Sequence, residues 1–263
     1  MNYIILDLEA TCYDKNDLQS KSKQSEIIEI GAVKLNEKLE IISRFESFVK
    51  PKNDPVLSDF CKDLTRITQK DIDDADSFSE VIEDFKSWIG SNYILCSWGF
   101  YDKNQFIKDC VLHGLDYEWV ERHISIKHQF MEMEIFKESS IYKKQVKKKR
   151  RPSAGMMTAL NILGIEHKGI HHRGIDDAEN IANIFVSIFK DLQFPITLNN
   201  RFDCVFENDY KGIFMEVNDN QTHVAFSFYN RFEIEGEVCL REKELDSLIN
   251  LLQELKKNSF KIK

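Results

Sequence analysis

The hydrophobic positions at the start of the chain predict three neighbouring β-strands. Residues 2–9, 26–35 and 40–49 are rich in Ile, Leu, Val and Phe, and each range is short enough for a strand. The connections between them are too short for a crossover helix, so we expect antiparallel pairing. The sequence therefore predicts a meander at the N-terminus.

Helical periodicity begins after this meander. Apolar residues recur every three or four positions between Ser77 and Gly90, and Ser77 and Glu80 have the spacing of a capping box. The short apolar range 93–98 predicts a further strand. Similar periodicity predicts helices at 103–113, 153–163 and 175–192. Strands that later alternate with helices favour an α/β fold, with a mixed sheet flanked by helices.

A change of pattern near Pro195 predicts a domain boundary, with one domain at 1–194 and another at 195–263. Apolar and polar residues alternate from 201 to 240, and the alternation is broken at Asn208, Asn218 and Asn230. A helical pattern follows at about 242–257. We expect a small C-terminal α+β domain, to which the sequence assigns no role.

Composition narrows the class of protein. The 263 residues are 42% hydrophobic and 30% charged, and no apolar run reaches the ~20 residues of a membrane helix. Met1 leads directly into the first strand without a secretory signal, and the six cysteines contain no Cys-x-x-Cys pair. We expect a cytoplasmic protein with reduced thiols and no membrane span. The net charge of −8 argues against binding nucleic acid by bulk electrostatics alone, but a local basic patch or bound metals could still do so.

Two acids interrupt the first apolar run. Asp7 and Glu9 are two residues apart, so on a strand they point to the same face. Two anions side by side on a central strand repel each other unless a cation or a proton offsets the charge. A metal site is one interpretation of the pair, and a strand end that meets water is the other.

Further polar residues precede the helical patterns. Asp102 lies where the strand at 93–98 gives way to a helix, so it can serve either as a helix cap or as a metal ligand. His172 and Asp177 stand at the entry to the most strongly periodic helix. They can reach one cleft if His172 lies in a loop and Gly174 allows the chain to turn, which leaves Asp177 in the first helical turn.

Together these residues carry a resemblance. Asp7-x-Glu9, Asp102 and His172-x-x-x-x-Asp177 match, in order and spacing, the motifs of the DEDDh 3′-to-5′ exonuclease family. Within that family the chain most resembles the histone-mRNA and small-RNA 3′-end exonucleases and their bacterial relatives. This closer resemblance rests on the segments DLEATC at 7–12, EIIEIGAV at 26–33 and HRGIDDAENIA at 172–182.

The resemblance covers about residues 2–191 and implies an RNase H-like fold and a nuclease. It implies that two Mg²⁺ ions, for which Mn²⁺ can substitute, are bound by Asp7, Glu9, Asp102 and Asp177. Carboxylate oxygens suit such hard cations. His172 is then the general base, a role that suits imidazole. Ala10 and Thr11 are expected to flank the terminal nucleotide. The expected reaction releases nucleoside 5′-monophosphates from a nucleic-acid 3′ end, on RNA or single-stranded DNA.

Several alternatives stay open. The same motifs suit a proofreading exonuclease that acts on DNA, although the branch resembled favours RNA, and a nucleic-acid-binding module without turnover is a rival from another class. Arg173 can pair with an acid or with a phosphate. The basic run at 143–151 is either a solvated loop or a contact for the substrate backbone. We leave His171 and Asp176 out of the expected site, and the sequence identifies no protein partner.

Overall fold

The structure is a computed structural model. It describes residues 1–14 and 24–192 with their side chains, and the backbone of four further strands between residues 198 and 241. The chain forms two compact units, Met1–Gln193 and Phe194–Lys263, which are described separately below.

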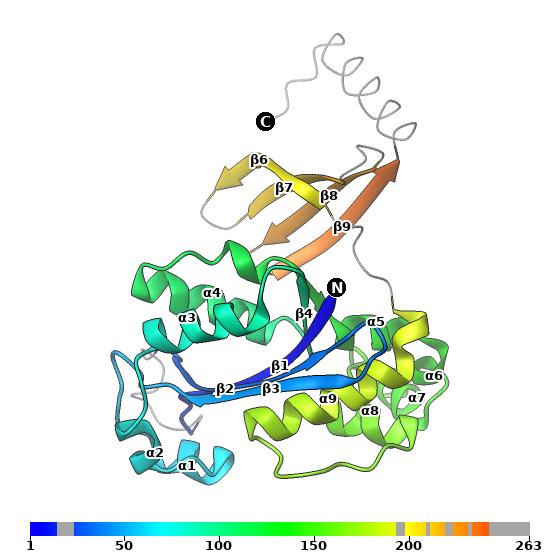
Figure 1. Cartoon of the computed structure of the whole chain (residues 1–263). Helices are drawn as coiled ribbons and strands as arrows, with labels where there is room; N and C mark the ends of the chain where they lie inside the picture. The colour runs from blue at the N-terminus through cyan, green and yellow to red at the C-terminus, as the bar shows by residue number, and fades with distance from the viewer. Residues whose placement is uncertain (15–23, 193–197, 209–210, 219–222, 231–232, 242–263) are drawn as a thin grey trace. The chain divides into compact units, whose positions relative to one another are not determined.

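A five-stranded sheet organises the first unit (Figure 1). Its order is β3 (Ile41–Phe48), β2 (Ile27–Leu35), β1 (Asn2–Ala10), β4 (Tyr93–Ser97) and β5 (His123–Ser125). β1, β2 and β3 pair antiparallel, whereas β4 runs parallel to β1 and β5 parallel to β4. The predicted meander and the mixed direction of the sheet are confirmed.

Helices cover both faces of this sheet, with α3 (Phe78–Ile89) and α4 (Tyr101–His113) on one face and α9 (Gly174–Ile188) on the other (Figure 1). Side chains of β1 alternate between the two layers. Leu6 packs in one core with Phe85 of α3 and Phe106 of α4. Tyr3 instead contacts Phe185 of α9, with ring centroids 5.2 Å apart. β1 is thus buried on both faces, which explains its continuous apolar run.

The predicted helix ends agree with the structure to within three residues at most positions. Ser77 and Glu80 form both bonds of the predicted capping box at the start of α3, and Gly90 ends that helix. α4 begins two residues earlier than predicted, and α8 (Met156–Leu163) begins three residues later. α9 ends at Ile188, and a 3₁₀ turn at Phe189–Asp191 continues the predicted helix.

Several short helices are absent from the sequence prediction. They are α1 (Asp59–Thr65), α2 (Gln69–Asp73), the 3₁₀ turn η2 (Glu118–Val120), α5 (Ile126–Glu132), α6 (Glu134–Lys137) and α7 (Ser140–Lys147). Helices of eight residues or fewer complete about two turns, so their apolar positions establish no period. The basic run at 143–151 is helical in its first five residues, 143–147, which belong to α7.

The second unit contains a four-stranded antiparallel sheet in the order of the sequence. Its strands are β6 (Leu198–Asn208), β7 (Lys211–Asn218), β8 (His223–Asn230) and β9 (Glu233–Arg241). The first three strands end at the asparagines that predict their turns. The helix predicted at about 242–257 lies outside the described residues.

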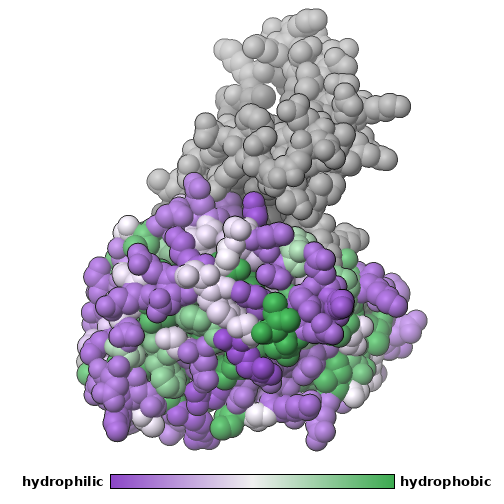
Figure 2. Space-filling model, in the orientation of Figure 1, coloured by the Kyte–Doolittle hydropathy of each residue, from purple (hydrophilic) through white to green (hydrophobic). Residues whose placement is uncertain are grey.

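The surface of the first unit in the view of Figure 2 is largely hydrophilic, with hydrophobic side chains gathered in small patches. Among the helices that the structure describes, none combines the length and apolar character needed to cross a membrane.

Candidate active site

Acidic side chains from three separate elements meet beside the carboxyl end of β1. Asp7 and Glu9 belong to β1, Asp102 to the first turn of α4, and Asp177 to the first turn of α9. Burial raises the pKa of Asp7 well above its ordinary value, and repulsion from Asp102, Glu9 and Asp177 raises it further. The four carboxyl groups that the sequence singles out therefore share one electrostatic environment.

Glu9 shows how unfavourable this environment is for an anion. The residue is only 8% exposed. Burial, followed by repulsion from Glu29, Asp177 and Asp102, raises the pKa of Glu9 from 4.5 to about 8. At neutral pH the cluster thus retains protons unless a cation offsets its negative charge.

Asp102 is not the cap of its helix. Phe100 occupies the cap position of α4, and Asp102 is the second helical residue. The backbone amide of Leu8 donates a hydrogen bond of 3.2 Å to Asp102 Oδ1, which ties α4 to β1. Burial raises the pKa of Asp102 to about 6, although hydrogen bonds from Ser97 and Leu8 oppose the shift. Of the two roles that the sequence left open, capping is excluded.

Two glycines allow α9 to approach the sheet closely enough to join this cluster. Gly31 of β2 is the cross-strand partner of Asp7, and Gly174 begins α9. A Cβ on Gly31 would lie 1.9 Å from the carbonyl carbon of Gly174, and one on Gly174 would lie 3.1 Å from the carbonyl oxygen of Asp7. Backbone thus meets backbone at this point, which only glycine permits.

The expectation that Gly174 supplies the turn before α9 is wrong. Gly174 has no positive φ, whereas His172 has φ of 67° and adopts the left-handed conformation. That conformation costs a non-glycine residue about 1–2 kcal/mol. The backbone amide of His172 donates a hydrogen bond of 3.0 Å to Asp177 Oδ2, which stabilises the turn.

His172 reaches the carboxylate cluster from this loop. Its Nδ1 lies 4.0 Å from Glu9 Oε1, and 40% of its side chain is exposed. Partial burial, and repulsion from His171, lower the pKa of His172 below its ordinary value, although Asp177 opposes the shift. The imidazole is therefore mainly neutral at pH 7 and able to accept a proton.

The first turns of α9 hold the whole loop from His167 to His172. Asp176 accepts a hydrogen bond of 2.7 Å from the amide of Ile170. Asn180 accepts one of 3.0 Å from the amide of Lys168 and donates one of 2.7 Å to its carbonyl oxygen. Asp176, which the sequence analysis leaves out of the site, thus anchors the loop that carries the histidines.

His171 contacts the site from which the sequence analysis excludes it. Its Nδ1 lies 2.9 Å from Asp177 Oδ2, and its ring stacks on that of His172 with centroids 4.0 Å apart. His167 completes the group, with Nε2 3.8 Å from Asp177 Oδ1. The doublet His171-His172 is a visible signal in the sequence, but nothing there indicates which histidine faces which acid.

Arg173 pairs with acids, which resolves the other open alternative. Its Nη2 lies 3.0 Å from Glu29 Oε1 and 3.2 Å from Glu46 Oε1. Glu29 is completely buried and also accepts a hydrogen bond of 2.9 Å from the amide of Gly174. Sequence reasoning missed Glu29, and the signal for it is a single acid within the otherwise apolar stretch 27–33 of β2.

Ala10 and Thr11 lie directly after Glu9, and both are buried. Thr11 Oγ1 accepts a hydrogen bond of 3.0 Å from the amide of Glu26, and the amide of Thr11 donates one of 2.8 Å to the carbonyl oxygen of Glu26. The polar atoms of Thr11 thus help to join the end of β1 to the start of β2.

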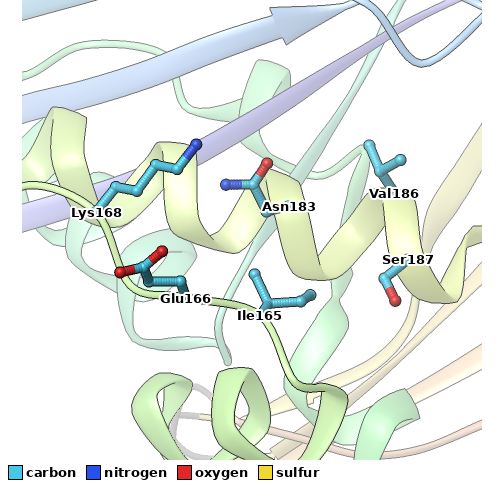
Figure 3. A pocket seen from close by; sticks show the side chains of 6 residues that line it. All are labelled: Ile165, Glu166, Lys168, Asn183, Val186 and Ser187. Carbon is cyan, nitrogen blue, oxygen red and sulfur yellow. The ribbon is translucent and has the colours of Figure 1, made fainter.

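A hollow of about 400 Å³ lies elsewhere on the first unit (Figure 3). It is formed by the segment before α9 and by one side of that helix, and it contains none of the residues that the sequence predicts for the site. Its lining consists of Ile165, Glu166, Lys168, Asn183, Val186 and Ser187.

Comparison with known proteins places this arrangement in a family. The sequence pattern of the family described as Exonuclease, of the RNase T type, matches residues 4–185. The 3′-5′ exoribonuclease 1 of Rattus norvegicus is 32% identical over 197 residues, which cover 71% of this chain and 52% of the relative. The Homo sapiens protein of the same name is 33% identical with the same coverage. The chain thus spans about half the length of these curated relatives.

Solved structures agree in fold. The nuclease domain of 3′hExo, a DEDDh family member bound to rAMP, is 31% identical, with a TM-score of 0.62, and the match covers 74% of this chain and 96% of that domain. A structure of a 3′-exonuclease that recognises the histone mRNA stem-loop is 28% identical, with a TM-score of 0.62 and coverage of 83% and 71%. The RNase H-like fold predicted from the sequence is confirmed, and the chain belongs to the exonuclease family, in its DEDDh branch near the histone-mRNA exonucleases.

Proposed function

We propose that this protein is a divalent-cation-dependent 3′-to-5′ exonuclease that removes nucleoside 5′-monophosphates from the 3′ end of nucleic acid and prefers RNA. One observation carries the proposal: carboxylates from β1, α4 and α9 converge beside a half-exposed histidine. The preference for RNA is supported by the relatives, which are named exoribonucleases.

Asp7, Glu9, Asp102 and Asp177 fit a pair of hard divalent cations. All four offer oxygen, and the raised pKa values of Asp7 and Glu9 reflect uncompensated negative potential that such cations offset. We propose Mg²⁺, with Mn²⁺ as a substitute. Cations bound there would supply activation of a water molecule and stabilisation of the leaving 3′ oxygen.

The protein's own residues would contribute position and proton transfer. His172, which is neutral at pH 7, would take a proton from the attacking water, and the turn locked by Asp177 would aim its ring. Ala10 and Thr11 would form a fixed wall for the terminal nucleotide, because their backbone is bonded to β2.

The basic run at 143–151 would bind the strand upstream of the 3′ end. The side chain of Gln145 in α7 bonds Ser153 in both directions, at 2.7 and 2.9 Å. Trp98 Nε1 donates a hydrogen bond of 3.2 Å to the carbonyl oxygen of Ala154. These bonds connect the basic run to the segment that follows β4 and leads to Asp102, which supports a contact with the backbone of the same substrate.

The cysteines support the proposed location. Cys12, Cys61, Cys96 and Cys110 are free thiols in the structure. Since free thiols persist in reducing compartments, we propose that the protein works in the cytoplasm.

The test is release of mononucleotides from matched RNA and DNA oligonucleotides, single-stranded or with a 3′ overhang on a duplex. We expect release that begins at the 3′ end, proceeds faster on RNA, stops with EDTA and returns with excess Mg²⁺. Faster release from DNA would contradict the RNA preference and indicate a proofreading type of exonuclease. Binding without release in Mg²⁺ or Mn²⁺ would contradict the enzyme.

A further inference from the structure

Beside the four carboxylates, the structure contains a second set of potential metal ligands with a different chemistry. His167, His171 and Asp177 each offer one ligand atom, an imidazole nitrogen or a carboxylate oxygen, and these three atoms all lie within 4.8 Å of one another. Tetrahedral zinc, with ligands at about 2.1 Å, holds its donor atoms roughly 3.4 Å apart. The donors would therefore have to approach one another by up to about 1.4 Å to hold an ion.

A buried nitrogen of His167 without a hydrogen bond is independent evidence that this site can accept a ligand. Its Nε2 is shielded from solvent and has no hydrogen bond, a condition it shares, within the described residues, only with Nδ1 of His123. The atom is directed towards Asp177 Oδ1 but stays 3.8 Å away, beyond hydrogen-bonding distance. A buried nitrogen without a partner destabilises the folded protein, and a bound metal would supply the missing partner.

The backbone around these histidines is already fixed. Bonds from Asn180 hold Lys168, and bonds from Asp176 and Asp177 hold Ile170 and His172, so His171 lies between two anchored residues and His167 directly precedes one. Gly169 has φ of 75°, and a Cβ there would lie 2.3 Å from the Asp176 carboxyl carbon, so the loop is pressed against α9. Preorganisation of this kind lowers the entropic cost of binding an ion.

We propose that His167, His171 and Asp177 form a binding site for a zinc-like transition metal, and that an ion there withdraws Asp177 from the catalytic carboxylates. Two imidazoles and one carboxylate select zinc over magnesium, which prefers oxygen. The side chain of His171 is 42% exposed, so an ion can enter from solvent and retain water in its fourth position. The site is therefore inhibitory; this consequence rests on the proposed function, whereas the binding itself does not.

Binding is tested first, without Mg²⁺ and without substrate. Zn²⁺ is titrated into the full chain by calorimetry, and Co²⁺ is followed by its visible absorption. We expect one ion at this site beside any that the carboxylates bind, and we expect His167→Gln and His171→Gln each to weaken binding of that ion at least tenfold. His113→Gln is the matched control, because His113 lies at the far end of α4 against Phe78, and it should bind Zn²⁺ as the wild type does.

Asp7→Asn separates this site from the carboxylate cluster. The variant removes a cluster ligand and leaves all three proposed zinc ligands in place, so we expect it to retain Zn²⁺ binding. Wild-type affinity in both His167→Gln and His171→Gln would overturn the proposal. Loss of binding in Asp7→Asn alone would do the same, because it would place the zinc among the carboxylates.

Inhibition is tested in Mg²⁺. We expect micromolar Zn²⁺ to slow mononucleotide release, and the half-inhibiting concentration, taken relative to each protein's own rate without zinc, to rise at least tenfold in His167→Gln. An unchanged half-inhibiting concentration would overturn the inhibitory role. If the wild type released no mononucleotides at all, the proposed function would fail while the binding experiment stayed decisive.

Discussion

Glu9 and Glu29 are directly opposite each other on β1 and β2, yet they have opposite surroundings. Both are buried, at 8% and 0% exposure. Glu29 bonds Arg173 and the amide of Gly174, so the fold itself compensates its charge. Glu9 instead faces other acids, and its pKa rises to about 8. A buried acid that serves the structure is paired within the chain, whereas one that serves chemistry is left for a partner from solution.

The largest expected effect comes from the uncompensated side of this comparison. Asp7→Asn should lower the rate of mononucleotide release in Mg²⁺ about a thousandfold or more, because loss of a metal ligand removes several kcal/mol of transition-state stabilisation. Circular dichroism should stay unchanged. Asp59→Asn, at an exposed residue of α1, is the control and should keep full activity. A loss of less than tenfold would remove Asp7 from the proposed ligands.

Removing the charge of Glu29, which the fold compensates, should lower the stability of the protein. Glu29→Gln leaves Arg173 with only the exposed Glu46, so we expect the free energy of unfolding to fall by about 3 kcal/mol, as measured by urea denaturation. The double variant Glu29→Met, Arg173→Met should recover a large part of that loss. Equal stability of the wild type and Glu29→Gln would show that the ion pair does not support the fold.

Removing the charge of Glu9 should instead raise the stability of the protein when metal is absent. An acid whose pKa rises from 4.5 to about 8 on folding binds more protons in the folded state across that window. Stability in EDTA therefore falls as pH rises from about 5 to 8. A shift of about 3.5 pKa units at about 1.4 kcal/mol per unit sets an upper limit of roughly 4–5 kcal/mol, so Glu9→Gln should be more stable than the wild type at pH 8 by a few kcal/mol.

Denaturation at pH 5 and pH 8 measures this effect. The difference between Glu9→Gln and the wild type should shrink at pH 5, where Glu9 is protonated in the folded protein and the pH is only about half a unit above its unfolded pKa of 4.5. Glu83→Gln, at an exposed position of α3, should show neither the gain nor its pH dependence. A Glu9→Gln variant that is less stable than the wild type at pH 8 would contradict the repulsion argued for the cluster.

The smallest expected effect concerns binding away from the cluster. Replacing three lysines of the basic run by Gln should weaken RNA binding and flatten its salt dependence by roughly one unit of log–log slope for each phosphate that these lysines neutralise. The variant carries Lys144→Gln, Lys147→Gln and Lys148→Gln. Its charge-matched control carries Lys38→Gln, Lys70→Gln and Lys86→Gln. Equal slopes for the two variants would make the basic run a solvated surface.

The sequence predicts elements and motifs whose signals are local. The acids of β1, the capping box at Ser77 and the stripe of α9 each lie within one segment, and the structure contains all three. The partners of those residues are not local. Nothing in the sequence indicates that Arg173 bonds Glu29 rather than a phosphate, or that Asp102 bonds Leu8 instead of capping its helix, because the sheet topology decides both.

The three histidines before α9 show the same limit. Their spacing in a loop carries no period, so orientation follows from the anchors on α9 and from the left-handed turn at His172. The short helices between β4 and α8 were missed because their patterns are too brief.

The close approach of Gly31 and Gly174 has a consequence for how this site tolerates change. Because no side chain stands between β2 and α9 there, backbone contact sets how closely the helix that carries Asp177 approaches the strand that pairs with Asp7. We therefore expect changes of side-chain size in the surrounding core to alter that spacing little. The two glycines thus limit how closely α9 approaches the sheet, so the active centre can keep its dimensions while residues of the surrounding core are substituted.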